Sequence, residues 1–152
     1  MQKKVQIVSD GSLDLPQEIT DAHDIEVVPF YVSFNGETYQ KEIEEIGIRE
    51  FYQKMVDHPD VFPKSSMPSV DDFYQTFVKS AKENIPVICI CITTKFSGSL
   101  QSATVAKEMV KDEYPEFRIT VIDSTVNTVL QGLYVLEACR LRDMGLDYEE
   151  IV

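Results

Sequence analysis

A cluster of hydroxyl side chains follows an apolar segment in the second half of the chain. After VICICI at 87–92, the sequence TTKFSGSLQSA places five hydroxyls around one glycine, namely Thr93, Thr94, Ser97, Ser99 and Ser102. Gly98 would let a ligand approach the backbone, and the first N–H groups of a helix beginning here would point outward at the positive end of its dipole. The segment predicts an anion-binding loop. Helix capping by Ser97 or Ser99 is the alternative, and one hydroxyl can serve both roles.

Two other loops carry polar side chains directly after apolar segments. SDGSLD occupies residues 9–14, and DSTVNT occupies residues 123–128. In a parallel sheet the carboxyl ends of the strands share one edge, where ligands bind in open α/β sheets. We therefore expect both loops to line the same edge as the loop over 93–99. The rim residues predicted from them are Asp10, Ser12, Ser124 and Thr125.

A second hydroxyl cluster, FPKSSMPSVDDF at residues 62–73, is flanked by prolines. Proline disfavours the helical region for the residue before it, so the segment is expected to be extended. By pattern alone it is interpreted as a linker in which Ser69 caps the next helix, with Asp72 completing a near capping box.

Several enzyme and binding classes lack their motifs in this sequence. None of the six glycines lies in G-x-x-x-x-G-K-[ST] or G-x-G-x-x-G, which argues against a nucleotide phosphate site. Ser97 lacks the G-x-S-x-G context of a hydrolase nucleophile, and His23 and His58, the two histidines, are expected at the surface. Asp10 and Asp14 are interpreted as turn caps, so we predict no metal.

The charge of the chain limits its partners. It has 26 acidic and 14 basic residues, with a net charge of -12 at pH 7. This charge repels nucleic-acid phosphates and anionic lipid surfaces, so we predict no nucleic-acid partner. No apolar stretch approaches the roughly 20 residues of a membrane span, and we expect a soluble, cytoplasmic protein. Cys89 and Cys91 are expected to be buried thiols on one face of a strand.

Strands and helices alternate in the predicted secondary structure. Strands are predicted at 5–9, 25–34, 87–92 and 118–123, with a hairpin turn at 35–37 and a short return strand after it. Helical patterns cover 47–57, 69–84, 99–114 and 129–145. We predict an α/β fold with a mostly parallel sheet and helices on both faces, similar to a Rossmann fold. A new helix capped by Asp147 begins at the end of the sequence, so we expect the chain to be one domain of a longer protein.

Five stretches of the sequence follow one another at a characteristic spacing. They are IVSDGSLDLP (7–16), VVPFYVSFNGETY (27–39), KSSMPSVDDF (64–73), ITTKFSGSLQSA (92–103) and VIDSTVNTVLQGLYVLEA (121–138). Together they resemble the DegV family of bacterial fatty-acid-binding proteins. The resemblance implies a two-domain protein in which residues 1–152 form the α/β first domain. A long-chain fatty acid would lie between this domain and a second one that the chain lacks.

The same resemblance implies the residues of the site. Ser65 and Ser97 would hold the fatty acid carboxylate, and the further fatty-acid-binding positions are Ser66, Gly98 and Ser99. Met67 stands where the family has an amide, and Leu100 where it has a tyrosine. Both changes remove polar groups but leave the hydroxyls in place. No cofactor is implied apart from the bound fatty acid.

The resemblance also implies a carrier without catalysis of its own. It would present the acyl group to a separate fatty acid kinase, which makes an acyl phosphate for phospholipid synthesis. Each buried methylene is worth about 0.8 kcal/mol, so about fourteen of them contribute on the order of 11 kcal/mol before ordering costs. Two alternatives stay open: a serine-dependent acyl hydrolase with Ser97 as nucleophile and a base from outside this chain, or a non-catalytic interaction domain whose hydroxyls only cap helices.

Overall fold

Four parallel strands form the main sheet of the protein, which is described by a computed structural model over residues 5–152. The strands are β1 (Gln6–Asp10), β2 (Ile25–Val28), β6 (Val87–Cys91) and β7 (Ile119–Asp123), in the order β2-β1-β6-β7. Ile7 lies opposite both Ile25 and Ile88, and Cys89 lies opposite Val121. The predicted α/β class with a mostly parallel sheet is confirmed.

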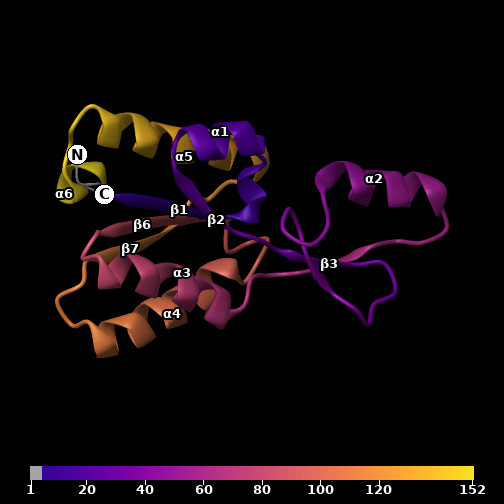
Figure 1. The fold of residues 1–152 in the computed structure, drawn as a ribbon, viewed down its shortest axis with the longest axis horizontal. Coiled ribbons are helices and arrows are strands. Elements are labelled where there is room, and N and C mark those ends of the chain that lie inside the picture. The colour runs from indigo at the N-terminus through magenta and orange to yellow at the C-terminus, as the bar shows by residue number, and fades with distance from the viewer. Residues whose placement is uncertain (1–4) are drawn as a thin grey trace.

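Helices cover both faces of this sheet and bury a separate apolar cluster on each (Figure 1). On one face, α3 (Val70–Lys82) and α4 (Ser99–Glu113) bury Phe73 and Phe77 completely. On the other face, α5 (Thr128–Asp143) buries Val135 and Cys139 and is followed by the short α6 (Tyr148–Ile151). α1 (Gln17–Ala22) connects β1 to β2. We call the parallel sheet with these helices the body.

The predicted single strand over 25–34 is wrong, because the chain forms two strands there in two different sheets. β2 ends at Val28, and β3 (Tyr31–Ser33) joins an antiparallel sheet with β4 (Gln40–Lys41) and β5 (Lys64–Ser66), in the order β4-β3-β5. Pro29 has no backbone N–H and cannot continue the parallel ladder. The next amide, that of Phe30, donates to Glu42 Oε1 at 3.0 Å instead.

The antiparallel sheet and α2 (Ile48–Asp57) make up a second unit, residues 31–66, which we call the arm. Figure 1 shows the arm projecting beyond the carboxyl ends of the parallel strands. The predicted turn and return strand are confirmed, since Gly36 has φ +75° and β4 pairs antiparallel with β3. The segment 62–69 is more than the predicted linker, because β5 within it pairs with β3. None of the residues in the apolar stripe of α2 is buried within residues 5–152.

The predicted caps Ser69 and Asp147 and the buried thiols are confirmed, whereas Gly98, and neither Ser97 nor Ser99, is the N-cap of α4. The Ser69 hydroxyl accepts from Asp72 N at 3.1 Å and the Asp72 carboxylate accepts from Ser69 N at 2.9 Å, which completes a capping box at the start of α3. Asp147 caps α6 in the same way. Cys89 and Cys91 are buried on one face of β6 with their sulfurs 3.7 Å apart, much longer than a disulfide bond.

Candidate functional site

The main sheet changes its direction of growth between β1 and β6. From β1 the chain adds β2 on one side, and later adds β6 and then β7 on the other side. Connections on the two sides run over opposite faces, and open α/β sheets bind ligands at the carboxyl ends of the two strands where this change occurs. The 3-10 helix η1 (Gly11–Leu13) follows β1 there, and the loop over 92–98 leads from β6 into α4.

Asp10, predicted at the rim, is fully buried at the end of β1. Its Oδ2 accepts from Ser99 Oγ at 2.7 Å and from Ile92 N at 3.0 Å. Its Oδ1 accepts from Gln131 Nε2 at 2.9 Å and from Ser12 N at 3.3 Å. Burial raises the pKa of Asp10, while these hydrogen bonds lower it by a smaller amount. The carboxylate therefore ties together the ends of β1 and β6 and the starts of η1, α4 and α5.

Gln131 was not predicted as a site residue, although the sequence contains a signal for it. It is fully buried on α5 on the same stripe as Val135, Ala138 and Cys139. A glutamine among apolar residues at helical spacing predicts a buried amide that needs partners. Its Nε2 donates to Ser9 Oγ at 3.0 Å as well as to Asp10. Its Oε1 has no hydrogen-bond partner within residues 5–152.

Ser97 lies two residues before the first residue of α4, and its hydroxyl proton is not used in a hydrogen bond within residues 5–152. Its Oγ accepts from Ser99 N at 3.2 Å, and the helix N-cap is Gly98. In the part of the chain that the structure describes, the Ser97 hydroxyl donates to no group, and neither do the backbone N–H groups of Gly98 and Leu100. Three unused donors at the positive end of a helix dipole are suited to an anion.

The hydroxyls predicted at the β7 end of the edge are already engaged. Ser124 Oγ donates to Val126 O at 3.1 Å, and Thr125 Oγ1 donates to Ser124 O at 2.6 Å. Thr94 Oγ1 donates to Asp123 Oδ2 at 2.7 Å, and this bond is the main reason that the pKa of Asp123 lies below its usual value. Ser124 and Thr125 therefore fix the shape of their loop and offer no free donor.

The second hydroxyl cluster lies on β5. Ser65 is paired with Val32 and Ser66 with Tyr31, and both serines are exposed. Their hydroxyls donate to no group within residues 5–152. Because neighbouring residues of a strand point to opposite faces, Ser65 and Ser66 face opposite sides of the arm sheet. Only one of the pair can face a given head group.

Met67 follows the last residue of β5, and its side chain lies close to Gly98 at the start of α4. Its Sδ would lie 2.7 Å from a Cβ on Gly98, a distance that a side chain at this position would not permit. Gly98 is therefore the residue that allows the approach, although its backbone φ of -81° is open to other residues. This contact brings the two hydroxyl motifs, 64–69 and 93–99, into one neighbourhood.

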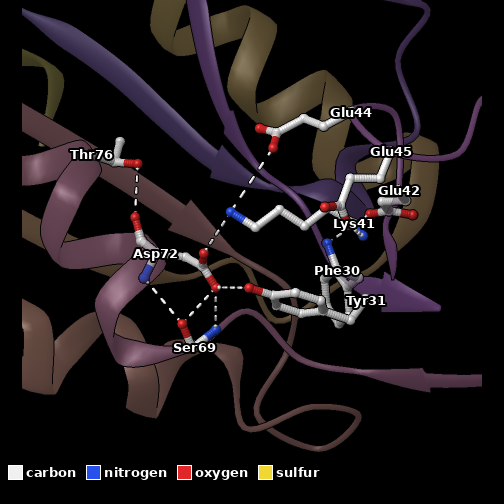
Figure 2. A network of polar contacts seen from close by, with 9 residues as sticks. All are labelled: Phe30, Tyr31, Lys41, Glu42, Glu44, Glu45, Ser69, Asp72 and Thr76. Atoms are coloured by element: carbon white, nitrogen blue, oxygen red, sulfur yellow. Dashed lines mark hydrogen bonds and ion pairs between the residues drawn. The ribbon is translucent and has the colours of Figure 1, made fainter. Parts of the chain in front are cut away.

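Asp72, at the start of α3, holds the arm against the body (Figure 2). Lys41 Nζ lies 2.9 Å from its Oδ1, and the Tyr31 hydroxyl donates to its Oδ2 at 2.8 Å. Ser69 Oγ donates to the same Oδ2 at 2.6 Å. Burial by itself would raise the pKa of Asp72, but the bonds from Lys41, Ser69 and Tyr31 lower it to about 2. One carboxylate thus fixes the sheet that carries Ser65 relative to α3.

Neither histidine lies at the carboxyl edge of the sheet. His23 follows α1 where the chain enters β2, at the opposite edge, and His58 follows α2 in the arm.

Within residues 5–152, no three His, Cys, Asp or Glu side chains are grouped to hold a metal ion. No helix of this part of the chain has the length and apolar character needed to cross a membrane.

The fold defines the class of protein as an open α/β domain. Its parallel sheet carries unused hydroxyl and amide donors at its carboxyl edge. Residues 4–152 match the DegV family, whose members are described as uncharacterised proteins. A DegV domain-containing protein of Clostridium acetobutylicum is 39% identical over 149 residues, which are 98% of this chain and 51% of that relative. The chain therefore belongs to the DegV family. It spans about half the length of the curated relatives it matches.

Solved structures agree with this assignment. A stearic acid-binding protein from Eubacterium ventriosum has a TM-score of 0.93 and 44% identity, covering 97% of this chain and 50% of that one. A fatty-acid-binding DegV family protein from Thermus thermophilus has a TM-score of 0.81 and 32% identity, with the same coverage. The resemblance predicted from the five sequence stretches is confirmed at the level of family and fold.

Proposed function

We propose that this chain is the carboxylate-binding half of a fatty-acid carrier. Ser97 Oγ and Ser65 Oγ donate to the carboxylate of a long-chain fatty acid, and the Gly98 backbone N–H supports them. The observation that carries the proposal is the unused proton of Ser97, which lies beside two unused amides where Met67 brings β5 against Gly98. The relatives that bind stearic acid and other fatty acids share this fold.

The free and engaged hydroxyls divide the predicted site residues into two groups. Ser12, Ser65, Ser66 and Ser97 keep free protons within residues 5–152. The hydroxyls of Ser99, Ser124 and Thr125 are engaged, and the Asp10 carboxylate is filled by internal donors. We therefore assign ligand contact to Ser97 and Ser65, with Ser12 at the rim, whereas Ser66 faces the other side of the arm sheet.

Neutral donors suit a carboxylate ligand in this protein. The chain carries a net charge of -12, so the long-range field disfavours an anion. Hydrogen bonds to a charged group contribute about 1.5 to 3 kcal/mol each, which lets a few short contacts outweigh that field. The buried methylenes supply most of the affinity, and the donors orient the head group.

A second domain and a kinase complete the proposal. The relatives are about twice as long as this chain, and we infer that a second domain covers the acyl tail in the whole protein. The bound fatty acid is then presented to a separate fatty acid kinase for acyl phosphate formation, as the family resemblance implies. The protein itself needs no catalytic residue for this role.

The test uses the complete gene product, purified from a bacterial host, extracted with organic solvent and analysed by mass spectrometry. We expect stoichiometric long-chain fatty acid in the wild-type protein. Ser97→Ala loses one hydrogen bond to a charged group, so its fatty acid affinity is expected to fall by about tenfold or more. Ser124→Ala is the matched control, because it removes a hydroxyl from the same edge that is already engaged by Val126 O. Equal affinity in the Ser97→Ala and wild-type proteins would contradict the proposal.

Other outcomes identify the alternative functions. Labelling of Ser97 by a fluorophosphonate probe would indicate an acyl hydrolase, whose base then comes from outside residues 5–152. A protein that neither retains fatty acid nor takes it up when it is added would indicate an interaction domain.

A further inference from the structure

We propose that Asp10 is the positioning residue of the head-group site and acts on Ser97 through Ser99. This role rests on the proposed function, since it explains how the hydroxyl that binds the carboxylate is held. Asp10 and Ser99 are themselves fully buried, and their side chains bond to each other.

Ser99 links Asp10 to Ser97 through two different groups. Its hydroxyl donates to Asp10 Oδ2 at 2.7 Å, and its backbone N–H donates to Ser97 Oγ at 3.2 Å. The only hydroxyl proton of Ser99 is therefore directed inward. The position of its amide, which holds the Ser97 oxygen, is fixed by the anchored side chain of the same residue.

The amide of Ser99 also orients the Ser97 hydroxyl. A hydroxyl oxygen has two lone pairs and one proton, and a donor bound to one lone pair restricts where the proton can point. With Ser99 N–H on one side of Ser97 Oγ, the proton is directed away from the helix end, where it is free for a ligand. A preorganised donor of this kind loses less entropy when the head group binds.

Asp10 is suited to the anchoring role because it is a carboxylate. It accepts hydrogen bonds from four donors, two on each oxygen, whereas an asparagine has one oxygen and would turn its NH₂ group toward two of the donors. Burying this group carries a cost, seen in the direction of its pKa shift. The donors come from η1, the end of β6, α4 and α5, so the anchor is fixed from several sides.

The first test is a double-mutant cycle on fatty acid affinity in the complete gene product. Ser99→Ala is expected to weaken fatty acid binding by about fivefold or more. If Ser99 acts through Ser97, the Ser97→Ala/Ser99→Ala double variant binds no more weakly than Ser97→Ala alone. Losses that multiply would show that Ser99 contacts the ligand directly, and would overturn the positioning role.

A matched variant separates positioning from general destabilisation. Phe77→Leu disturbs the apolar core under α3 but changes none of the hydrogen bonds of Asp10, Ser97 or Ser99. We expect it to lower stability and to leave fatty acid affinity within about twofold of wild type. An affinity loss equal to that of Ser99→Ala would contradict the inference.

The orientation of the Ser97 side chain can be measured without a ligand, so it tests the positioning role even if the wild-type protein binds no fatty acid. Side-chain NMR couplings of Ser97 are expected to show a single rotamer in the wild-type and Phe77→Leu proteins, and averaging in Ser99→Ala. Asp10→Ala should show the same averaging. Because that variant removes the shared acceptor of four donors, Ser99→Ala carries the test if Asp10→Ala does not fold. A single Ser97 rotamer in Ser99→Ala would overturn the inference, whereas absent fatty acid binding alone would refute only the proposed function.

Discussion

The body and the arm of this protein differ in what holds their side chains in place. In the body, Phe73 and Phe77 of α3 are fully buried against the parallel sheet. In the arm, Tyr52 of α2 is 61% exposed, and Phe62, just before β5, is 84% exposed. Both apolar core clusters lie in the body, whereas the arm buries the apolar side chains of Val32 and Ile46 outside either cluster.

Polar contacts hold the arm where the apolar core is missing. Lys41 and Tyr31 of the arm converge on Asp72 of α3, and Glu42 of the arm accepts from the Phe30 backbone (Figure 2). Glu42 is half-buried, and this burial raises the pKa of its carboxyl group. The proposed site is thus divided between a rigid half with Ser97 and a half with Ser65 whose position depends on these polar contacts.

The largest effect is expected from a cavity in the body. Phe73→Ala should lower the free energy of unfolding by about 3 to 5 kcal/mol, because it empties a fully buried position. Phe62→Ala in the arm is the matched change and should cost less than about 0.5 kcal/mol. Urea unfolding followed by circular dichroism measures both. Similar losses in the two variants would show that the arm has a core of its own after all.

A smaller effect is expected from loosening the arm. Asp72→Asn weakens the contacts with Lys41 and Tyr31 and the cap of α3, which should cost about 1 to 2 kcal/mol. Hydrogen exchange should increase in β3 and β5 but not in β6. Asp71→Asn, which changes an exposed acid of the same first turn, is the control and should leave exchange in the arm unchanged.

The same carboxylate gives a pH dependence with a defined sign. Because the folded state lowers the pKa of Asp72 from 3.8 to about 2, its contribution to stability is complete above pH 3.8 and is lost as the pH falls through about 2. The stability difference between wild type and Asp72→Asn should therefore shrink between about pH 4 and pH 2. A difference that stays constant over this range would argue against the ionic contact.

The smallest effect concerns the contact between arm and body at Met67. Gly98→Ala places a Cβ 2.7 Å from Met67 Sδ, but the methionine end is flexible, so the cost should be about 1 kcal/mol or less. Adding Met67→Ala should recover most of that loss, because it clears the space. Thermal unfolding of the single and double variants measures the coupling. Strictly additive losses would show that the two residues do not meet in solution.

Much of the fold could be predicted from local patterns. The periods of apolar residues predicted β1, β6, β7 and the long helices, and the Asn35–Gly36 turn and the Ser69 capping box were visible as short motifs. The strand predicted over 25–34 was wrong although Pro29 marked the break, because the alternation of apolar residues continues across it. The α2 stripe was visible too, but a period alone does not say whether a partner surface lies within the same chain.

The sequence by itself determined which residue types stand at the carboxyl edge of the sheet, because strand ends and parallel pairing follow from apolar patterns and chain order. Only the tertiary structure decided which of those hydroxyls are free. Ser99 bonds Asp10 across 89 residues of sequence, and Ser97, two positions away, keeps its proton unused. Whether a donor is engaged depends on groups that folding brings together from distant segments, and local spacing carries no information about that.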